Sequence, residues 1–135
     1  MNFWLLKSEP ETWSWDDQQS KGVEPWTGVR NHQATNHLKA MRQGDRAFFY
    51  HSGAERQIVG IVEVVREAYP DPTGETGRWV CVDVKALCPL PHPVTLAAIK
   101  AEPRLAGIAL VRQSRLSVMP IDVPSWNLLT KMCGT

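Results

Sequence analysis

Two apolar runs joined by a short polar turn constrain the fold of this chain most strongly. Residues 46–50 and 57–65 are rich in β-branched and aromatic side chains, and the polar segment 52–55 separates them. This arrangement is typical of an antiparallel β-hairpin. Residues 3–7 carry apolar side chains at both alternating sets of positions, which predicts a strand in the interior of the same sheet.

Proline and glycine indicate where further strands begin and end. Residues 79–85 alternate valine with other side chains, which predicts another strand, and the Pro- and Gly-rich residues 69–77 predict a loop before it. Three alternating prolines in residues 89–93 lack the N–H group that strand pairing uses, so we expect the ladder to end there. Residues 110–119 mix polar and apolar side chains and predict a loop followed by a strand.

Helix start signals occur at four places. A capping residue or a proline at a first helical position precedes an apolar pattern of helical spacing in each case. The starts are Ser14 (with Asp17 as its capping partner), Asn31, Thr95 and Pro124, and the expected ends of the first three helices are Gly22, Gly44 and the residue before Pro103.

These elements predict one α+β domain over residues 1–135. A chain of 135 residues with 43% hydrophobic side chains has the size and composition of a single core. Five to six strands with helices inserted between them predict a small mixed, mostly antiparallel β-barrel or curved sheet with flanking helices. The order of the predicted strands and loops also predicts that five polar segments converge at one mouth: residues 8–9, 26–31, 51–52, 69–71 and 112–115.

The charge balance limits the partners of this chain. Fifteen Lys and Arg against 14 Asp and Glu give a net charge of +1, which argues against histone-like binding of polyanions, so any contact with nucleic acid must be local. No apolar run reaches the ~18 residues of a membrane span. We therefore expect a soluble, cytoplasmic protein, more readily a monomer than an oligomer.

The cysteines and histidines indicate neither a metal site nor a cofactor. Cys81, Cys88 and Cys133 show no paired spacing, and His32 and His37 are five residues apart rather than four. No glycine-rich phosphate loop is present either. We expect reduced thiols in the core, no bound metal and no cofactor.

Seven segments, in order along nearly the whole chain, are similar to the EVE domain, itself similar to the YTH domain and the wider PUA-like fold. The segments are residues 4–10 (WLLKSEP), 14–17 (SWDD), 26–31 (WTGVRN), 48–52 (FFYHS), 58–60 (IVG), 68–73 (AYPDPT) and 110–118 (LVRQSRLSV). The resemblance implies a PUA-like barrel whose cleft accepts a modified base, such as methylated or further oxidised cytosine, without chemistry on it. It also implies aromatic side chains at the positions of Trp13 and His32, of which only Trp13 conforms.

A flipped base needs flat walls for its two faces, and this chain offers three candidates. Trp26 lies in a loop beside Pro25 and Gly28, where an indole can stand out from the core. Tyr69 is the second candidate wall and Phe49 the third. The alternative for Trp26 is packing between two helices, since most tryptophans are largely buried.

A base also presents a polar edge, and selectivity for one base depends on the groups that meet it. Glu9 could accept a hydrogen bond from the exocyclic amine of cytosine, and its alternative role is to cap the following helix. Asp71, between two prolines, could instead form only a turn. The candidate polar residues are Ser8, Glu9, Asn31, His51, Ser52 and Asp71.

Three arginines are candidates for contacts with the phosphates that flank a flipped nucleotide. They are Arg30, Arg112 and Arg115, and Gln113 and Ser114 lie between the last two. Arg30 is the strongest candidate of the three. The alternative for each arginine is a surface ion pair of little energetic value.

Two other function classes remain open from the sequence. Ser8 or Ser52 with His51 and Asp71 resembles a Ser-His-Asp set, and Glu9 with Asp71 resembles a carboxylate pair, which would make the protein a base- or nucleotide-processing hydrolase. No serine lies in a Gly-x-Ser-x-Gly elbow. The third class is an RNA-binding module that reads shape, for which the basic residues would form a continuous stripe.

Overall fold

A mixed β-sheet forms the centre of the computed structural model, which describes residues 1–75 and 77–134. Thr76, inside the loop expected over residues 69–77, and Thr135 lie outside the described residues. The strands are β1 (Phe3–Ser8), β2 (Val23–Pro25), β3 (Arg46–His51), β4 (Gln57–Pro70), β5 (Val80–Thr95) and β6 (Val118–Ile121). Their order is β2-β5-β4-β3-β1-β6. The β1–β3 pair is parallel and the other neighbouring pairs are antiparallel.

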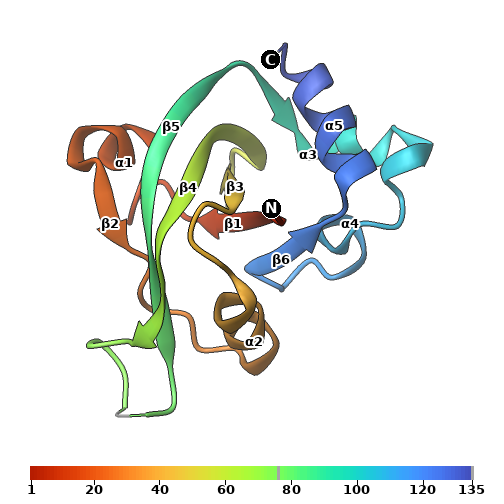
Figure 1. Ribbon diagram of the computed structural model, residues 1–135. Coiled ribbons are helices and arrows are strands. Elements are labelled where there is room, and N and C mark those ends of the chain that lie inside the picture. The colour runs from red at the N-terminus through yellow and green to blue at the C-terminus, as the bar shows by residue number, and fades with distance from the viewer. Residues whose placement is uncertain (76, 135) are drawn as a thin grey trace.

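The helices lie around this sheet, and β4 and β5 bend strongly across it (Figure 1). They are α1 (Trp15–Lys21), α2 (His32–Ala40), α3 (Leu96–Lys100), the 3-10 turn η1 (Pro103–Leu105), α4 (Ala109–Arg112) and α5 (Val123–Met132). Register shifts between β4 and β5 accompany the bend, because bulges curve a strand. The sheet is not closed, so the predicted α+β class is confirmed in its curved-sheet form.

Local side-chain capping explains where α1, α2 and α3 begin. The Ser14 hydroxyl accepts from the Asp17 N–H while Asp17 accepts from the Ser14 N–H, and Asn31 and Thr95 cap α2 and α3 in the predicted way. α1 is followed by Gly22 as expected. The end predicted for α2 was wrong, since the helix stops at Ala40 rather than running to Gly44.

The β5 strand contradicts the expectation that the proline cluster ends the ladder. β5 continues through Pro89, Pro91 and Pro93 to Thr95. Because the prolines alternate, the missing N–H groups fall on one side of the strand and the other side keeps its donors. The His92 N–H donates to the Cys133 carbonyl after α5 at 3.1 Å, while the pairing with β4 skips from Pro89 to Val94 and then resumes.

Three further boundaries differ from the sequence prediction. β4 extends to Pro70, so the first part of the expected loop is strand. The short strand β2 was not predicted, and it contains only three residues. Residues 110–112, expected to be loop, belong to the single turn α4 (Ala109–Arg112). Elements this short carry too few residues to show a period.

The core lies on both faces of β1, as its two-sided apolar pattern predicts, and on both faces of β3. Leu5, Leu6, Phe48 and Phe49 are fully buried. Gly60 of β4 permits the close approach of α1, because a Cβ atom there would lie 2.5 Å from the Trp15 ring. This contact places the start of α1, and the turn that leads into it, beside the C-terminal end of β1.

Candidate functional site

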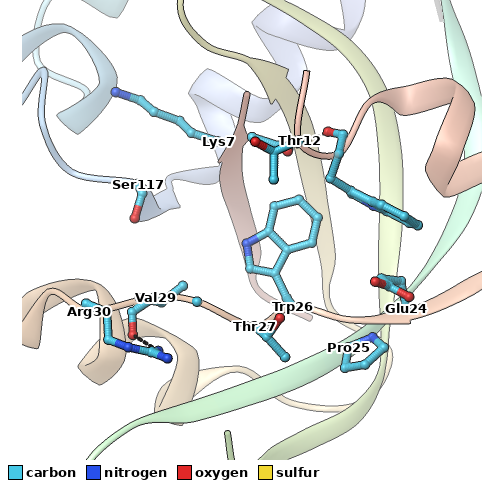
Figure 2. A pocket seen from close by; sticks show the side chains of 12 residues that line it. Lys7, Thr12, Glu24, Pro25, Trp26, Thr27, Val29, Arg30 and Ser117 are labelled. Carbon is cyan, nitrogen blue, oxygen red and sulfur yellow. Dashed lines mark hydrogen bonds between the residues drawn. The ribbon is translucent and has the colours of Figure 1, made fainter. Parts of the chain in front are cut away.

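A cavity of about 370 Å³ opens between the end of β1, the turn that follows it and the segment that continues β2. Indole, hydroxyl and charged groups share its wall, which combines flat surfaces with hydrogen-bonding atoms. Its lining residues are Lys7, Ser8, Thr12, Trp13, Glu24, Pro25, Trp26, Thr27, Gly28, Val29, Arg30 and Ser117. Figure 2 shows the Trp26 indole standing in the middle of this space.

Trp26 is held at its backbone and at one ring edge. Its backbone N–H donates to the Val82 carbonyl at 2.7 Å, and its ring packs edge to face against Phe49 with the ring centroids 5.4 Å apart. The residue is only 7% exposed, so it is largely buried as the packing alternative expects, but it packs on Phe49 of β3 rather than between two helices. The indole N–H donates to no residue that the structure describes, which leaves a donor for a molecule in the cavity.

Trp13 is a second indole at the cavity, positioned by the tight turn after β1. The Thr12 and Trp13 N–H groups both donate to the Glu9 carbonyl, and the Ser8 hydroxyl donates to the Trp13 carbonyl at 2.5 Å. The Trp13 indole N–H donates to Gln18 at 2.9 Å, a buried residue of α1. These bonds fix the ring relative to β1 and α1.

The loop that carries Trp26 is anchored by a buried carboxylate. Asp71, whose side chain is fully buried, accepts from the Gly28 N–H at 2.8 Å, from the Arg30 guanidinium at 3.2 Å and from both donors of Thr73. Burial alone would raise the pKa of Asp71, but these hydrogen bonds hold it below its ordinary value. Asp71 therefore does more than form a turn.

Arg30 lines the cavity, and its guanidinium is already engaged. It donates to the Val29 carbonyl, Asp71 and Thr73, and it lies 5.8 Å from the ring centroid of Trp79. Its side chain is 38% exposed. These contacts assign Arg30 to holding the loop, and its role as a phosphate contact stays a prediction.

Two charged groups of opposite sign line the cavity at separate places. Figure 2 shows Lys7 and Glu24 on opposite sides of the Trp26 indole. The Lys7 amine donates to the Ser114 carbonyl at 2.9 Å, and burial lowers the pKa of Lys7. Glu24, partly buried, lies 3.4 Å from the amine of the exposed Lys21.

A groove of about 320 Å³ is lined partly by residues that directly follow or precede cavity residues along the chain. Its lining residues are Asn31, Gln33, Arg112, Gln113, Ser114, Arg115 and Leu116. Arg112 and Arg115 are exposed and form no ion pair with a described residue. The groove thus gathers four of the predicted backbone-contact residues with Asn31.

The sequence-predicted site residues divide into three groups. Those that line the cavity are Ser8, Trp26 and Arg30; those that line the groove are Asn31, Arg112, Gln113, Ser114 and Arg115; and those that line neither are Glu9, Phe49, His51, Ser52, Tyr69 and Asp71. Of the five polar segments predicted to converge at one mouth, only segments 8–9, 26–31 and 112–115 contribute residues to the two depressions. Segments 51–52 and 69–71 contact the first two of these through the Ser52 N–H, which donates to the Ser8 carbonyl, and through Asp71, which accepts from the Gly28 N–H.

The residues outside both depressions have other contacts. Phe49 is fully buried between Trp15 and Trp26. The Tyr69 hydroxyl donates to Asp83, the Arg66 guanidinium lies 3.6 Å from the Tyr69 ring centroid, and burial raises the Tyr69 pKa. Ser52 donates its N–H to the Ser8 carbonyl, and Glu9 is exposed.

His51 hydrogen-bonds to the first residue of α1 and not to a serine hydroxyl. Its Nε2 accepts from the Trp15 N–H at 3.0 Å, so Nδ1 carries the hydrogen and donates to Glu55 at 2.9 Å. Among the described residues no hydrogen bond joins His51 to a serine hydroxyl or to Asp71. The contacts of a Ser-His-Asp set are therefore not formed by these residues.

Several cavity residues escaped the sequence prediction. Trp13 was recognised as a family aromatic but was not chosen as a site residue. Glu24 lies in the unpredicted strand β2, and Lys7 lies in a strand whose apolar neighbours indicated only core. The other residues that were missed are Thr12, Pro25, Thr27, Gly28, Val29 and Ser117.

Neither metal ligands nor a membrane helix emerge from the described part of the chain. Within residues 1–75 and 77–134 no three His, Cys, Asp or Glu side chains are grouped closely enough to hold a metal ion. No helix among these residues combines the length and the apolar composition that crossing a bilayer requires.

Comparison with known proteins connects this architecture to characterised relatives. Rat and chicken thymocyte nuclear protein 1 are 32% and 36% identical to the chain, with 97% and 96% of this chain and 73% and 67% of those proteins covered. A Rhodopseudomonas palustris protein of known structure is 60% identical, with a TM-score of 0.94 over 99% of this chain and 94% of that one.

A solved structure of human thymocyte nuclear protein 1 contains DNA with 5-methylcytosine. That chain is 29% identical to this one, with a TM-score of 0.93 over 100% of this chain and 99% of that chain. An ASCH protein from Zymomonas mobilis, 12% identical with a TM-score of 0.62 over 97% and 95% of the two chains, shares the fold alone. The model of the EVE domain matches residues 2–132. The chain therefore belongs to the EVE domain family.

Proposed function

We propose that this protein is a non-catalytic nucleic-acid-binding module that holds a flipped, modified base, such as 5-methylcytosine, in the cavity beside Trp26. The observation that carries the proposal is the indole wall with an unused N–H donor inside a cavity of about 370 Å³. That volume falls in the ~300–1,000 Å³ range of small-ligand pockets. The human relative bound to 5-methylcytosine-containing DNA supports the same ligand class.

Stacking on Trp26, with Trp13 nearby, supplies affinity without much selectivity. Base–aromatic stacking contributes ~1–3 kcal/mol and is tolerant of base identity. A single buried methyl group adds only ~0.8 kcal/mol, about a fourfold preference. Selectivity for one modified base must therefore come mainly from hydrogen bonds to its polar edge.

Glu24 is the carboxylate available for that edge. Glu9, predicted for this role from sequence, does not line the cavity, whereas Glu24 does. An ionised carboxylate accepts from the exocyclic amine of cytosine and repels the carbonyl oxygen that thymine or uracil presents at the same position. The Thr12, Thr27 and Ser117 hydroxyls and the Trp26 N–H are the groups available for the remaining edge atoms.

The groove beside the cavity offers contacts to the backbone of the same strand. Arg112 and Arg115 carry charge that no described carboxylate neutralises. Gln113 and Ser114, exposed between them, add hydrogen-bonding groups. Phosphate contacts of this type position a nucleic acid without reading its sequence.

Fluorescence anisotropy with labelled oligonucleotides tests the proposal. Single- and double-stranded oligonucleotides carrying cytosine, 5-methylcytosine, 5-hydroxymethylcytosine or N6-methyladenine are titrated at one fixed salt concentration. We expect one modified base to bind most tightly, and Trp26→Ala to weaken that binding about 5- to 150-fold, from ~1–3 kcal/mol of stacking. Trp26→Phe keeps a flat wall and should retain part of the affinity.

Two outcomes would contradict the proposal. Equal binding of all oligonucleotides, unaffected by Trp26→Ala, would replace the base reader with a general backbone binder. A changed oligonucleotide mass after incubation, measured by mass spectrometry, would show catalysis and overturn the non-catalytic part.

A further inference from the structure

The cavity and the groove are lined by neighbouring residues on two segments of the chain. Arg30 lines the cavity and the next residue, Asn31, lines the groove; Leu116 lines the groove and the next residue, Ser117, lines the cavity. The two depressions therefore share a border formed by the loop before α2 and the segment before β6.

Lys7 bridges this border. Its side chain lines the cavity, while its amine donates to the carbonyl of Ser114, a groove residue. The Lys7 amine also lies 5.8 Å from the ring centroid of Tyr50. Among the described residues no carboxylate pairs with this amine.

The groove carries positive charge, and the far side of the cavity carries negative charge. The groove lining contains Arg112 and Arg115 and no Asp or Glu. On the other side of the Trp26 indole lies Glu24 (Figure 2). A polyanion that enters the cavity with one base is attracted toward Lys7 and the groove and repelled from Glu24.

We propose that the Lys7 amine binds the phosphodiester of the nucleotide whose base enters the cavity, and that the strand continues from there along the groove past Arg112 and Arg115. The inference rests on the proposed function and adds the path of the backbone to it. A phosphate at Lys7 supplies the counter-charge that this partly buried amine lacks within the protein. Consistent with that, the burial that lowers the Lys7 pKa is offset when an anion is bound.

The test uses the dependence of affinity on salt. Each phosphate neutralised by a cation contributes ~0.7–0.9 to the slope of log K against log salt concentration. Lys7→Met, which keeps an apolar stem beside Tyr50, should lower affinity about tenfold and reduce the slope by ~0.7–0.9. The loss should be equal for cytosine and 5-methylcytosine oligonucleotides, since a phosphate carries no base information.

Two control variants make the result specific. Lys7→Arg keeps the charge and should retain the slope. Lys131→Met removes an exposed lysine of α5 that lines neither depression, and it should leave both affinity and slope unchanged. Near-ultraviolet circular dichroism of each variant checks that its fold is retained.

Three results separate this inference from the proposed function. A weaker Lys7→Met variant with an unchanged salt slope would overturn the phosphate contact and indicate a packing role. Loss of the preference for 5-methylcytosine at an unchanged slope would overturn it too and indicate a base contact. A reduced slope in Lys7→Met, with Trp26→Ala binding normally, would support the phosphate contact and overturn the base cavity.

Discussion

At the scale of single residues, Trp26 has two roles, because one part of its ring packs on the core and another part lines the cavity. The edge-to-face contact with Phe49 holds the Trp26 ring at the centre of the sheet. The indole N–H donates to no described residue. A wall held in this way loses little side-chain entropy when a base stacks on it. Preorganisation of this kind is expected to increase affinity rather than selectivity.

Glu24 is the residue proposed to select the base, and a matched ligand pair tests this role. 5-Methylcytosine and thymine carry the same methyl group and differ in the amine or carbonyl that faces the carboxylate. Glu24→Gln replaces a pure acceptor with an amide that also donates. We expect the preference for 5-methylcytosine over thymine to fall about tenfold, from ~1–3 kcal/mol of edge pairing, measured by competition anisotropy.

Glu9→Gln is the control for that experiment, because Glu9 is an exposed carboxylate outside the cavity. It should leave the preference unchanged. If Glu9→Gln reduces the preference and Glu24→Gln does not, the original sequence assignment is right and the cavity assignment of Glu24 is wrong.

Residue patterns predicted part of the site and could not predict the rest. Trp26 could be chosen because Pro25 and Gly28 mark a loop around it. Phe49 could not be excluded, because the face to which a strand residue points depends on pairing register as well as on sequence alternation. Glu24 gave no signal, since a three-residue strand has no readable period.

At the scale of elements, the Asp71 carboxylate joins the β4–β5 connection to the loop before α2. It satisfies N–H groups from Gly28 and Thr73 as well as the Arg30 guanidinium. Removing it leaves buried donors unpaired on two segments at once. The stability of this part of the cavity wall therefore depends on the hydrogen bonds that the Asp71 carboxylate accepts.

A pH series tests this anchor. The hydrogen bonds depress the folded-state pKa of Asp71 below the ordinary 3.8, so its contribution is complete above that value and is lost as pH falls through the folded pKa. Asp71→Asn should lower the free energy of unfolding by about 2–3 kcal/mol near neutral pH. The difference from wild type should narrow in acid, as measured by urea unfolding.

Glu11→Gln is the comparison for this series, because Glu11 is exposed and its side chain forms no hydrogen bond or ion pair with a described residue. It should change the free energy of unfolding by less than about 0.5 kcal/mol. A difference between Asp71→Asn and wild type that stays constant down to acid pH would mean that the ionised carboxylate contributes nothing.

Elements were predictable where local chemistry decides them. The helix starts at Ser14, Asn31 and Thr95 follow from side-chain capping, which acts within three residues. The course of β5 depends on neighbours far along the chain, and its prolines misled the prediction because a strand tolerates missing donors on one side. Tertiary pairing therefore overrode the local signal there.

At the scale of the whole molecule, the near-neutral total conceals an uneven distribution of charge. The chain carries +1 in total, yet Arg112 and Arg115 share one groove in which no carboxylate takes part. Composition predicted that nucleic-acid contacts must be local, but only the folded arrangement gathers the arginines beside the cavity. Association with a polyanion should therefore depend on orientation more than on net charge.

One continuous sheet and one core predict a single cooperative unit. Urea unfolding followed by tryptophan fluorescence and by far-ultraviolet circular dichroism should give coincident transitions. An oligonucleotide at about 100 times its dissociation constant should stabilise the protein by ~2.7 kcal/mol. Separated transitions in the two signals would contradict the single-domain prediction.

The position of β1 between β3 and β6 also has a consequence for synthesis on the ribosome. Leu5 pairs with Phe48 on one side and with Met119 on the other. Translation adds ~5–20 residues per second, so one edge of the first strand stays open for several seconds after its other partner has emerged. During that interval an exposed apolar edge can pair with another chain, which makes the nascent protein, rather than the finished one, the form most dependent on chaperones.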